Sequence, residues 1–245
     1  DGMYCGAQTD PAICGACLAA QPAFAGVDIV AWREAHRPLV ERASFLIAPS
    51  RWAADTLARF YPSARVRVVP HGIPEVTPRH AGTRLAVMLP DDGVPTVAVL
   101  GAVGPDKGAR RIERLVELAR ERGSSVRFVL IGYLDRQHAA WQSDDARFTV
   151  HGRYDPRDLP DLLAHYRVSL VLYPSAGPET FSYTLSEAWS AGRPVLVPPS
   201  GALPERVSPT GAGGVLDDAE WRDERRMLDR IQALLASSRA DDLAR

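Results

Sequence analysis

Two hydrophobic patterns alternate along the chain from residue 95 to residue 236. The first is a short, unbroken run rich in valine, leucine and isoleucine, which is typical of a strand buried on both faces of a sheet. Such runs predict strands over residues 96–100, 126–131, 148–150, 168–173 and 194–197.

The second pattern lies between these runs, where apolar residues recur every three or four positions and predict amphipathic helices. Helices are expected over residues 109–122, 156–165 and 182–190, and a terminal helix carries Trp221, Met227 and Leu235 on its apolar face. Gly123 and Gly192 end two of these helices as C-terminal caps. Strands that alternate with helices predict the α/β class, here a Rossmann-like parallel sheet with helices on both faces.

The first seventy residues carry a shorter version of the same alternation. Helices are expected over residues 31–42 and 51–60, the second with Ser50 as its N-cap, and strands over residues 44–48 and 66–69. Residues 73–84 have the composition of a linker. We therefore predict a partial domain over residues 1–70, a second domain over residues 71–236 and a frayed polar tail over residues 237–245. Because Asp1 lies within a loop pattern, we expect the chain to be a fragment of a longer protein.

The composition is that of an ordinary soluble globular protein, with 46% apolar and 24% charged residues. The formal net charge of -1 argues against a nucleic-acid partner, and acidic residues interleave with Arg110, Arg111 and Arg114, which are expected to form a solvated helix face. No apolar run reaches the ~20 residues that cross a bilayer, and no secretory signal opens the chain. These features predict a cytoplasmic protein, and peripheral attachment to the inner face of a membrane stays open.

Three cysteines, Cys5, Cys14 and Cys17, lie near the start of the chain. The odd number argues against a disulfide framework. Cys14 and Cys17 have the C-x-x-C spacing of ligands to zinc or an iron–sulfur centre, although a structural zinc site takes four ligands. His36, or a residue upstream of Asp1, could be the fourth. An incomplete structural zinc site and a trio of reduced thiols are equally compatible with this pattern.

Four glycine-rich or polar loops follow the ends of successive predicted strands. They cover residues 101–108, 132–133, 151–153 and 173–179. Ligands of open parallel sheets bind just beyond the carboxyl ends of the strands. We therefore expect the four loops to converge on one ligand-binding crevice.

The first of these loops combines glycines, which let the backbone approach a ligand closely, with Lys107, which can place a positive charge against a phosphate. A Walker loop has its lysine after the last glycine, whereas Lys107 precedes Gly108. The dinucleotide fingerprint G-x-G-x-x-G is also absent from the loop. The spacing thus excludes both common nucleotide loops, and the loop taken alone is also compatible with a plain turn.

The fourth loop leads into a helix that is expected to start near Phe181 and Ser182. Free N–H groups and the positive end of the helix dipole would then face the crevice, a natural seat for a diphosphate. Glu187 would lie in the second turn, where its carboxylate could accept hydrogen bonds from two ribose hydroxyls. Glu179 precedes the helix and could reach towards a sugar.

Residues 173–194 resemble the E-x7-E segment of the retaining glycosyltransferases of family four, with Glu179 and Glu187 as the two acids. Residues 68–72, 101–108, 201–205 and 213–214 are similar to further motifs of that family, and they occur in the same order. The resemblance covers the chain from about residue 48 to the terminal helix. It implies the GT-B architecture, in which the active site lies between two domains.

The resemblance also implies a reaction and its residues. A sugar would pass, with retention and without a metal, from a UDP- or GDP-sugar to a glycan or lipid-linked acceptor held by a largely missing N-terminal domain. Lys107 and Glu179 would be catalytic, since Lys107 would contact the donor diphosphate and Glu179 would face the sugar. Glu187 would hold the ribose. Further donor contacts would come from Gly101, Gly132, Arg153, Tyr154, Thr180, Phe181 and Ser182.

The sequence departs from the family's pattern at three positions. Ala102 stands where the family has an arginine, so one of two expected cations on the diphosphate is missing, and Thr180 and Ser182 add hydroxyls beside the sugar. A non-catalytic nucleotide- or sugar-binding module of the same fold is therefore the alternative. Lys107 and the two glutamates favour the enzyme, although this fragment is expected to bind donor better than it transfers sugar.

Overall fold

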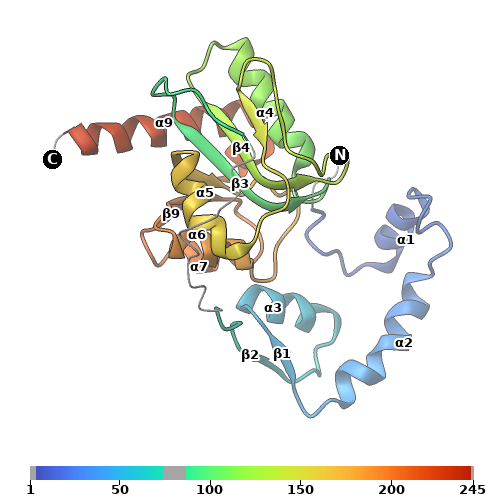
Figure 1. Ribbon diagram of the computed structural model, residues 1–245. Coiled ribbons are helices and arrows are strands. Elements are labelled where there is room, and N and C mark those ends of the chain that lie inside the picture. The colour runs from blue at the N-terminus through green and yellow to red at the C-terminus, as the bar shows by residue number, and fades with distance from the viewer. Residues whose placement is uncertain (1–3, 74–86, 244–245) are drawn as a thin grey trace. The chain divides into compact units, whose positions relative to one another are not determined.

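The computed structural model describes residues 4–73 and 87–243. The chain forms two compact units, divided between Gly72 and Ile73 (Figure 1). Apart from Ile73, the predicted linker over residues 73–84 lies outside the described residues.

The larger unit is built on a seven-stranded sheet with the strand order β5-β6-β4-β3-β7-β8-β9. Every neighbouring pair is parallel except β5 with β6. The first strand of this unit is the central strand β3, and β4 and β6 are added on one side of it. The chain then returns to the other side of β3 and adds β7, β8 and β9. The direction in which strands are added therefore reverses between β3 and β7, which makes this the switch point of a Rossmann-like sheet. The strands are β3 (Thr96–Val103), β4 (Arg127–Leu134), β5 (Trp141–Gln142), β6 (Phe148–Val150), β7 (Val168–Leu172), β8 (Val195–Val197) and β9 (Gly213–Val215).

Helices cover both faces of this sheet (Figure 1). Along β3, Ala98 and Leu100 belong to a buried cluster with residues of α5, α6 and α7, whereas the alternate residues Val97 and Val99 are buried on the opposite face. That opposite face is the side of α4, which packs against β4 and α9. The helices are α4 (Ala109–Glu121), the 3-10 turn η1 (Pro156–Asp158), α5 (Leu159–His165), α6 (Tyr183–Ser190), α7 (Ala202–Val207), α8 (Asp218–Arg222) and α9 (Glu224–Leu243).

The predicted α/β class with a Rossmann-like sheet is confirmed, and several details differ. The edge strand β5 is antiparallel and was not predicted, because its two residues are too short for a periodic signal. Helix α7 and strand β9 were not predicted either. Helix α9 continues to Leu243, through most of the predicted polar tail. Residues 237–243 contain no glycine or proline to break the helix. Strands β3 and β4 both extend three residues further than predicted.

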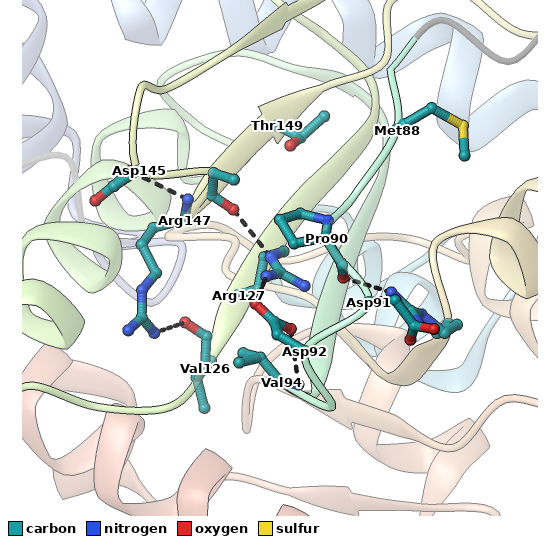
Figure 2. Close-up of polar contacts among 12 residues, drawn as sticks. Met88, Pro90, Asp91, Asp92, Val94, Val126, Arg127, Asp145, Arg147 and Thr149 are labelled. Carbon is teal, nitrogen blue, oxygen red and sulfur yellow. Dashed lines mark hydrogen bonds and ion pairs between the residues drawn. The ribbon is translucent and has the colours of Figure 1, made fainter.

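The segment that leads into β3 is fixed by polar side chains from neighbouring elements (Figure 2). Arg127 on β4 is only 3% exposed, and its guanidinium donates to the Asp92 carboxylate at 2.7 Å and to the Ala146 carbonyl at 2.9 Å. Arg167 pairs with Asp91, and His165 Nε2 lies 3.0 Å from the Val87 carbonyl oxygen. Asp91 and Asp92 precede β3, Arg127 is the first residue of β4, and Arg167 directly precedes β7. These contacts therefore lie at the amino ends of the strands, away from the expected crevice.

The smaller unit consists of α1 (Pro11–Ala19), α2 (Ile29–Arg42), β1 (Leu46–Ala48), α3 (Arg51–Phe60) and β2 (Val66–Val68). Strands β1 and β2 pair in parallel, and α3 connects them. Ser50 caps α3 as predicted, since its hydroxyl accepts a hydrogen bond from the Ala53 N–H at 3.1 Å. Several large apolar side chains of this unit are exposed, including Ile47 at 62%.

Among the helices that the structure describes, none combines the length and the apolar character needed to span a membrane.

Candidate functional site

The loops that follow β3 and β7 lie against each other at the switch point. Gly108 has φ +89°, and a Cβ there would lie 2.3 Å from the Pro174 carbonyl oxygen, so only glycine permits this approach. The Ala176 N–H donates to the Asp106 carbonyl at 3.1 Å and links the same two loops. Two segments nearly seventy residues apart in the sequence are therefore held side by side by their backbones.

Each of the two loops leads into a helix whose first turn has no side-chain cap among the described residues. Gly108 is the N-cap of α4 and Ser182 is the N-cap of α6, and neither supplies a capping hydrogen bond. The backbone closes part of the α4 start, since the Ala109 N–H donates to the Gly104 carbonyl at 3.1 Å and the Arg111 N–H to the Gly108 carbonyl at 3.0 Å. The positive end of the helix dipole remains at both starts and attracts anions. The start of α6, predicted at Phe181–Ser182, is one residue later than expected.

The backbone of Ser182 adopts φ +72°, a left-handed conformation that side chains disfavour. Such strain costs of order 1–3 kcal/mol and concentrates at functional sites. The Ser182 hydroxyl lies 3.1 Å from that of Thr184, which begins the first turn with Tyr183.

Lys107 and Glu179 line one small pocket of about 20 Å³. Lys107 is exposed and Glu179 is half-buried, so the cation lies at the rim. The other residues that line this pocket come from the ends of β3 and β7 and from the start of α6: Val99, Leu100, Val103, Leu172, Tyr173, Pro174, Ser175 and Thr184. The structure thus brings together the two residues that the sequence singled out as catalytic.

The backbone of Glu179 is fixed by the segment before α7. The Ala202 N–H donates to the Glu179 carbonyl at 2.8 Å, and Gly201 forms a parallel bridge with Glu179. A Cβ on Gly201 would lie 2.6 Å from the Glu179 nitrogen and oxygen, so glycine is required there as well. Thr180, the next residue, is exposed.

Glu187 accepts a hydrogen bond from the Tyr154 hydroxyl at 3.4 Å. Burial raises the pKa of Glu187, and the bond from Tyr154 acts in the opposite direction. The pKa of Tyr154 is raised by burial and by the nearby Glu187 charge. Glu187 is not among the residues that line the Lys107 pocket. It lies on α6, as does the pocket residue Thr184, and its carboxylate faces Tyr154 of the loop after β6.

Gly101 and Gly132 are a register pair on β3 and β4. A Cβ on Gly132, which has φ +140°, would lie 1.9 Å from the Gly101 carbonyl oxygen. Beyond them, the Arg153 guanidinium lies 4.6 Å from the centre of the Tyr133 ring, which also makes an edge-to-face contact with the His138 ring. Arg153 and His138 are exposed and Tyr133 is half-buried, and the group lies at the carboxyl ends of β4 and β6. Ala102 is exposed on β3, opposite Tyr133.

Arg206 on α7 was missed by sequence reasoning. Its guanidinium donates to the Phe181 carbonyl at 2.8 Å, the Ser182 carbonyl at 2.7 Å and the Ser186 hydroxyl at 2.7 Å. It also stacks at 4.0 Å from the centre of the buried Phe181 ring. Burial lowers its pKa, and Tyr173 and Glu179 act in the opposite direction. No local pattern identifies Arg206, because its partners lie 20–25 residues away.

Arg111 is a correction to the predicted solvated face. It is only 8% exposed, and its guanidinium donates to Glu224 at 2.9 Å and to the carbonyls of Pro174 and Trp221. Trp221 in turn donates from Nε1 to the Ser175 carbonyl at 2.9 Å. The loop after β7 is therefore held from behind by α4 and α8, while Arg110 is exposed as predicted.

The three cysteines are free and do not form a metal centre in the described part of the chain, where no group of three or more His, Cys, Asp or Glu side chains is arranged to hold a metal. The Cys14 thiol accepts a contact from Arg33 Nη2 at 3.2 Å, and Gln21 Nε2 lies 3.7 Å from Cys17 Sγ. His36 Nδ1 lies 2.7 Å from the Trp32 carbonyl oxygen.

Comparison with known proteins places this geometry among sugar-transferring enzymes. Residues 94–237 match the model of the family described as glycosyl transferases group 1. The chain is 29% identical over 187 residues to a GDP-mannose-dependent alpha-mannosyltransferase of Mycobacterium tuberculosis (strain CDC 1551 / Oshkosh), which covers 76% of this chain and 42% of that protein. The chain thus spans less than half the length of this curated relative.

Two solved structures share the fold. Sucrose-phosphate synthase from Thermosynechococcus elongatus has a TM-score of 0.64 at 21% identity, over 91% of this chain and 56% of that one. Anabaena HepE, solved with UDP and glucose, has a TM-score of 0.62 at 18% identity, over 84% of this chain and 58% of that one.

Proposed function

The chain belongs to the glycosyl transferases group 1 family, and from this premise we propose that its larger unit binds the nucleoside-diphosphate sugar of a glycosyl transfer. The observation that carries the proposal is the switch point. There, the positive dipole ends of α4 and α6, Lys107 and Glu179 lie at the facing loops of β3 and β7. A diphosphate needs positive charge and N–H donors, and a sugar needs a carboxylate that accepts from its hydroxyls.

The donor that we propose is a GDP- or UDP-sugar. The mannosyltransferase relative is named as GDP-mannose-dependent, and HepE was solved with UDP and glucose. In this chain the stack of Arg153 on Tyr133 is suited to the flat face of a base. Glu187, oriented by Tyr154, would accept hydrogen bonds from the ribose hydroxyls.

In the proposed reaction the diphosphate is the leaving group, and negative charge grows on its oxygens as the bond to the sugar breaks. Lys107 and the first-turn N–H groups of α6 are already in place before that charge develops, so they stabilise the transition state without reorganisation. Glu179 would hold the sugar against this leaving group. Retention of configuration and independence of a metal are proposed from the resemblance to family four.

The acceptor, which we propose to be a glycan or a lipid-linked sugar, would be bound by a further N-terminal domain. The relatives are longer than this chain, and the smaller unit exposes apolar side chains such as Ile47 and Val68 on a two-stranded sheet. A neighbouring strand layer would cover such residues. We also propose a cytoplasmic location, which fits the three free cysteines.

A non-catalytic binding module is the second candidate, and Ala102 is the observation that favours it. A missing charge-assisted contact weakens binding by roughly 1.5–3 kcal/mol. Ala102 would therefore lower the rate of sugar transfer but leave a measurable affinity for the nucleotide. The two candidates therefore differ in transfer activity once the longer protein is assayed with an acceptor.

Isothermal titration calorimetry with UDP, GDP and ADP tests the proposed function. We expect one of the three to bind, and we expect Lys107→Ala and Glu187→Ala each to weaken that binding by roughly 10- to 100-fold, because each removes a charge-assisted hydrogen bond. Arg110→Ala is the matched control, since Arg110 is an exposed cation three residues from Lys107. Binding that survives both substitutions unchanged, or a folded chain that binds none of the three nucleotides, would contradict the proposal.

A further inference from the structure

Two hydroxyl groups lie unused beneath Lys107 and Glu179. Tyr173 is 5% exposed and Ser175 is 3% exposed. Within the described part of the chain the Ser175 Oγ has no hydrogen-bond partner, and the Tyr173 Oη has no bond of good geometry but only a looser side-chain contact with Thr184. Both residues line the same small pocket as Lys107, Glu179 and Thr184.

Backbone hydrogen bonds fix the positions of the two residues that carry these hydroxyls. The Tyr173 N–H donates to the Leu196 carbonyl at 2.9 Å, and the Ser175 carbonyl accepts from Trp221 Nε1 at 2.9 Å. The Thr184 hydroxyl, which also lines the pocket, already pairs with the Ser182 hydroxyl. The geometry thus fixes two polar atoms in a place where the rest of the fold does not use them.

A buried hydroxyl without a partner destabilises a protein, and phenylalanine or alanine would fill the same space without that cost. An unsatisfied group of this kind calls for an explanation, such as a catalytic role or a bound ion. Here both groups border a pocket of about 20 Å³, the space of a single oxygen-bearing group. Lys107 and Glu179 both line the pocket, so an anionic oxygen would be held on its Lys107 side, where the two hydroxyls can donate to it.

The protonation of Tyr173 agrees with a donor role. Its pKa is raised well above the ordinary value, first by burial and further by Glu179, Glu187 and Tyr154, while Thr184 acts in the opposite direction. The phenol therefore keeps its proton at neutral pH.

We propose that Tyr173 Oη and Ser175 Oγ donate hydrogen bonds to a phosphate oxygen of the bound nucleoside diphosphate. This inference rests on the proposed function and adds two binding residues to it. The two O–H donors would form the floor beneath the phosphate, with the Lys107 ammonium at the rim. They would also supply part of the attraction that Ala102 does not.

The test compares Tyr173→Phe and Ser175→Ala with the wild-type chain, by calorimetry with the nucleoside diphosphate that binds and with its sugar derivative. We expect Tyr173→Phe to weaken both ligands roughly 10- to 100-fold, the usual effect of losing a hydrogen bond to a charged group. Ser175→Ala should weaken both in the same direction. A loss confined to the sugar derivative would assign the hydroxyls to the sugar and overturn the phosphate assignment.

Thermal unfolding without ligand gives a second readout. Tyr173→Phe should leave the Tm unchanged or higher, because the hydroxyl has no well-formed hydrogen bond to lose. The matched control is Tyr166→Phe, which removes a buried hydroxyl that lies 2.7 Å from His151 Nδ1 and should lower the Tm without changing affinity. A Tm for Tyr173→Phe that falls as far as the control's would show a partner within the protein and contradict the inference.

The binding results distinguish a failure of this inference from a failure of the proposed function. If the wild-type chain binds a nucleoside diphosphate and Tyr173→Phe binds it equally well, the inference is wrong and the proposed function stands. If the folded wild-type chain binds none, the proposed function fails and the inference fails with it.

Discussion

Gly132→Ala is expected to prevent the larger unit from reaching its native structure. The new Cβ would lie 1.9 Å from the Gly101 carbonyl oxygen and 2.6 Å from the carbonyl carbon, both backbone atoms of the adjacent strand. The φ of +140° adds strain for any side chain. Neither strand can move aside, because β3 and β4 are the centre of the sheet and are paired along their whole length. We expect a loss of about 4 kcal/mol or more, which places the variant among the most damaging single substitutions.

Near-ultraviolet circular dichroism and thermal unfolding would measure this effect. Gly177→Ala is the matched control, since a Cβ there meets nothing within 4 Å and its φ is not positive. The control should unfold within a few degrees of the wild-type chain. A Gly132→Ala protein with wild-type dichroism and Tm would show that the two strands do not approach as closely as described.

Arg206→Met is expected to lower the stability of the larger unit by about 2–4 kcal/mol and to weaken nucleotide binding. The substitution leaves the Phe181 and Ser182 carbonyls and the Ser186 hydroxyl without their donor and removes the stack on Phe181. Binding suffers because Arg206 holds the strained turn at Ser182, from which the first-turn N–H groups of α6 are directed. Arg206→Lys should recover only part of both losses, since one ammonium cannot reproduce a planar group with several fixed donors.

Urea unfolding, with hydrogen exchange of the α6 amides, would measure the two effects of Arg206→Met. Arg157→Met is the control, because the Arg157 side chain is 56% exposed and pairs with Asp155 on the surface. Surface pairs of that kind contribute about 0–1 kcal/mol. Unchanged exchange at the start of α6 in Arg206→Met would contradict the role assigned to Arg206.

The sequence was sufficient for the elements that local patterns encode. The apolar runs located β3, β4, β6, β7 and β8 to within a few residues, and Ser50 identified the start of α3. The order of loops after the strands also indicated where Lys107 and Glu179 would meet, since parallel strands end on one edge. These predictions succeeded because each depends on neighbours in sequence or on a general rule of parallel sheets.

Contacts between distant residues account for what the sequence did not reveal. Arg206 reaches back to Phe181, and Arg111 reaches forward to Trp221 and Glu224, so neither role follows from local composition. For Arg111 a signal did exist. It lies four residues before the buried Leu115, on the apolar side of α4, whereas Arg110 points away. Whether the Tyr173 and Ser175 hydroxyls have hydrogen-bond partners likewise depends on residues distant in the sequence, and only the three-dimensional structure shows it.

Lys107 is the only lysine in the sequence, and all the other residues in the count of lysines and arginines are arginines. It is exposed and lies at the rim of the proposed diphosphate site. An amine-specific acylating reagent will therefore modify one side chain, besides the N-terminal amine, and mass spectrometry can follow that one reaction. This makes the central residue of the site directly observable in the unmutated protein.

The most direct test of the account is the rate at which Lys107 is acetylated with and without nucleotide. We predict that the nucleoside diphosphate that binds will slow acetylation of Lys107, half-maximally at its calorimetric Kd, while the N-terminal amine reacts at an unchanged rate. The parent nucleoside, which lacks phosphate, should give no protection at the same concentration. Acetylation of Lys107 at the same rate in the presence of saturating diphosphate would contradict the claim that this lysine contacts it.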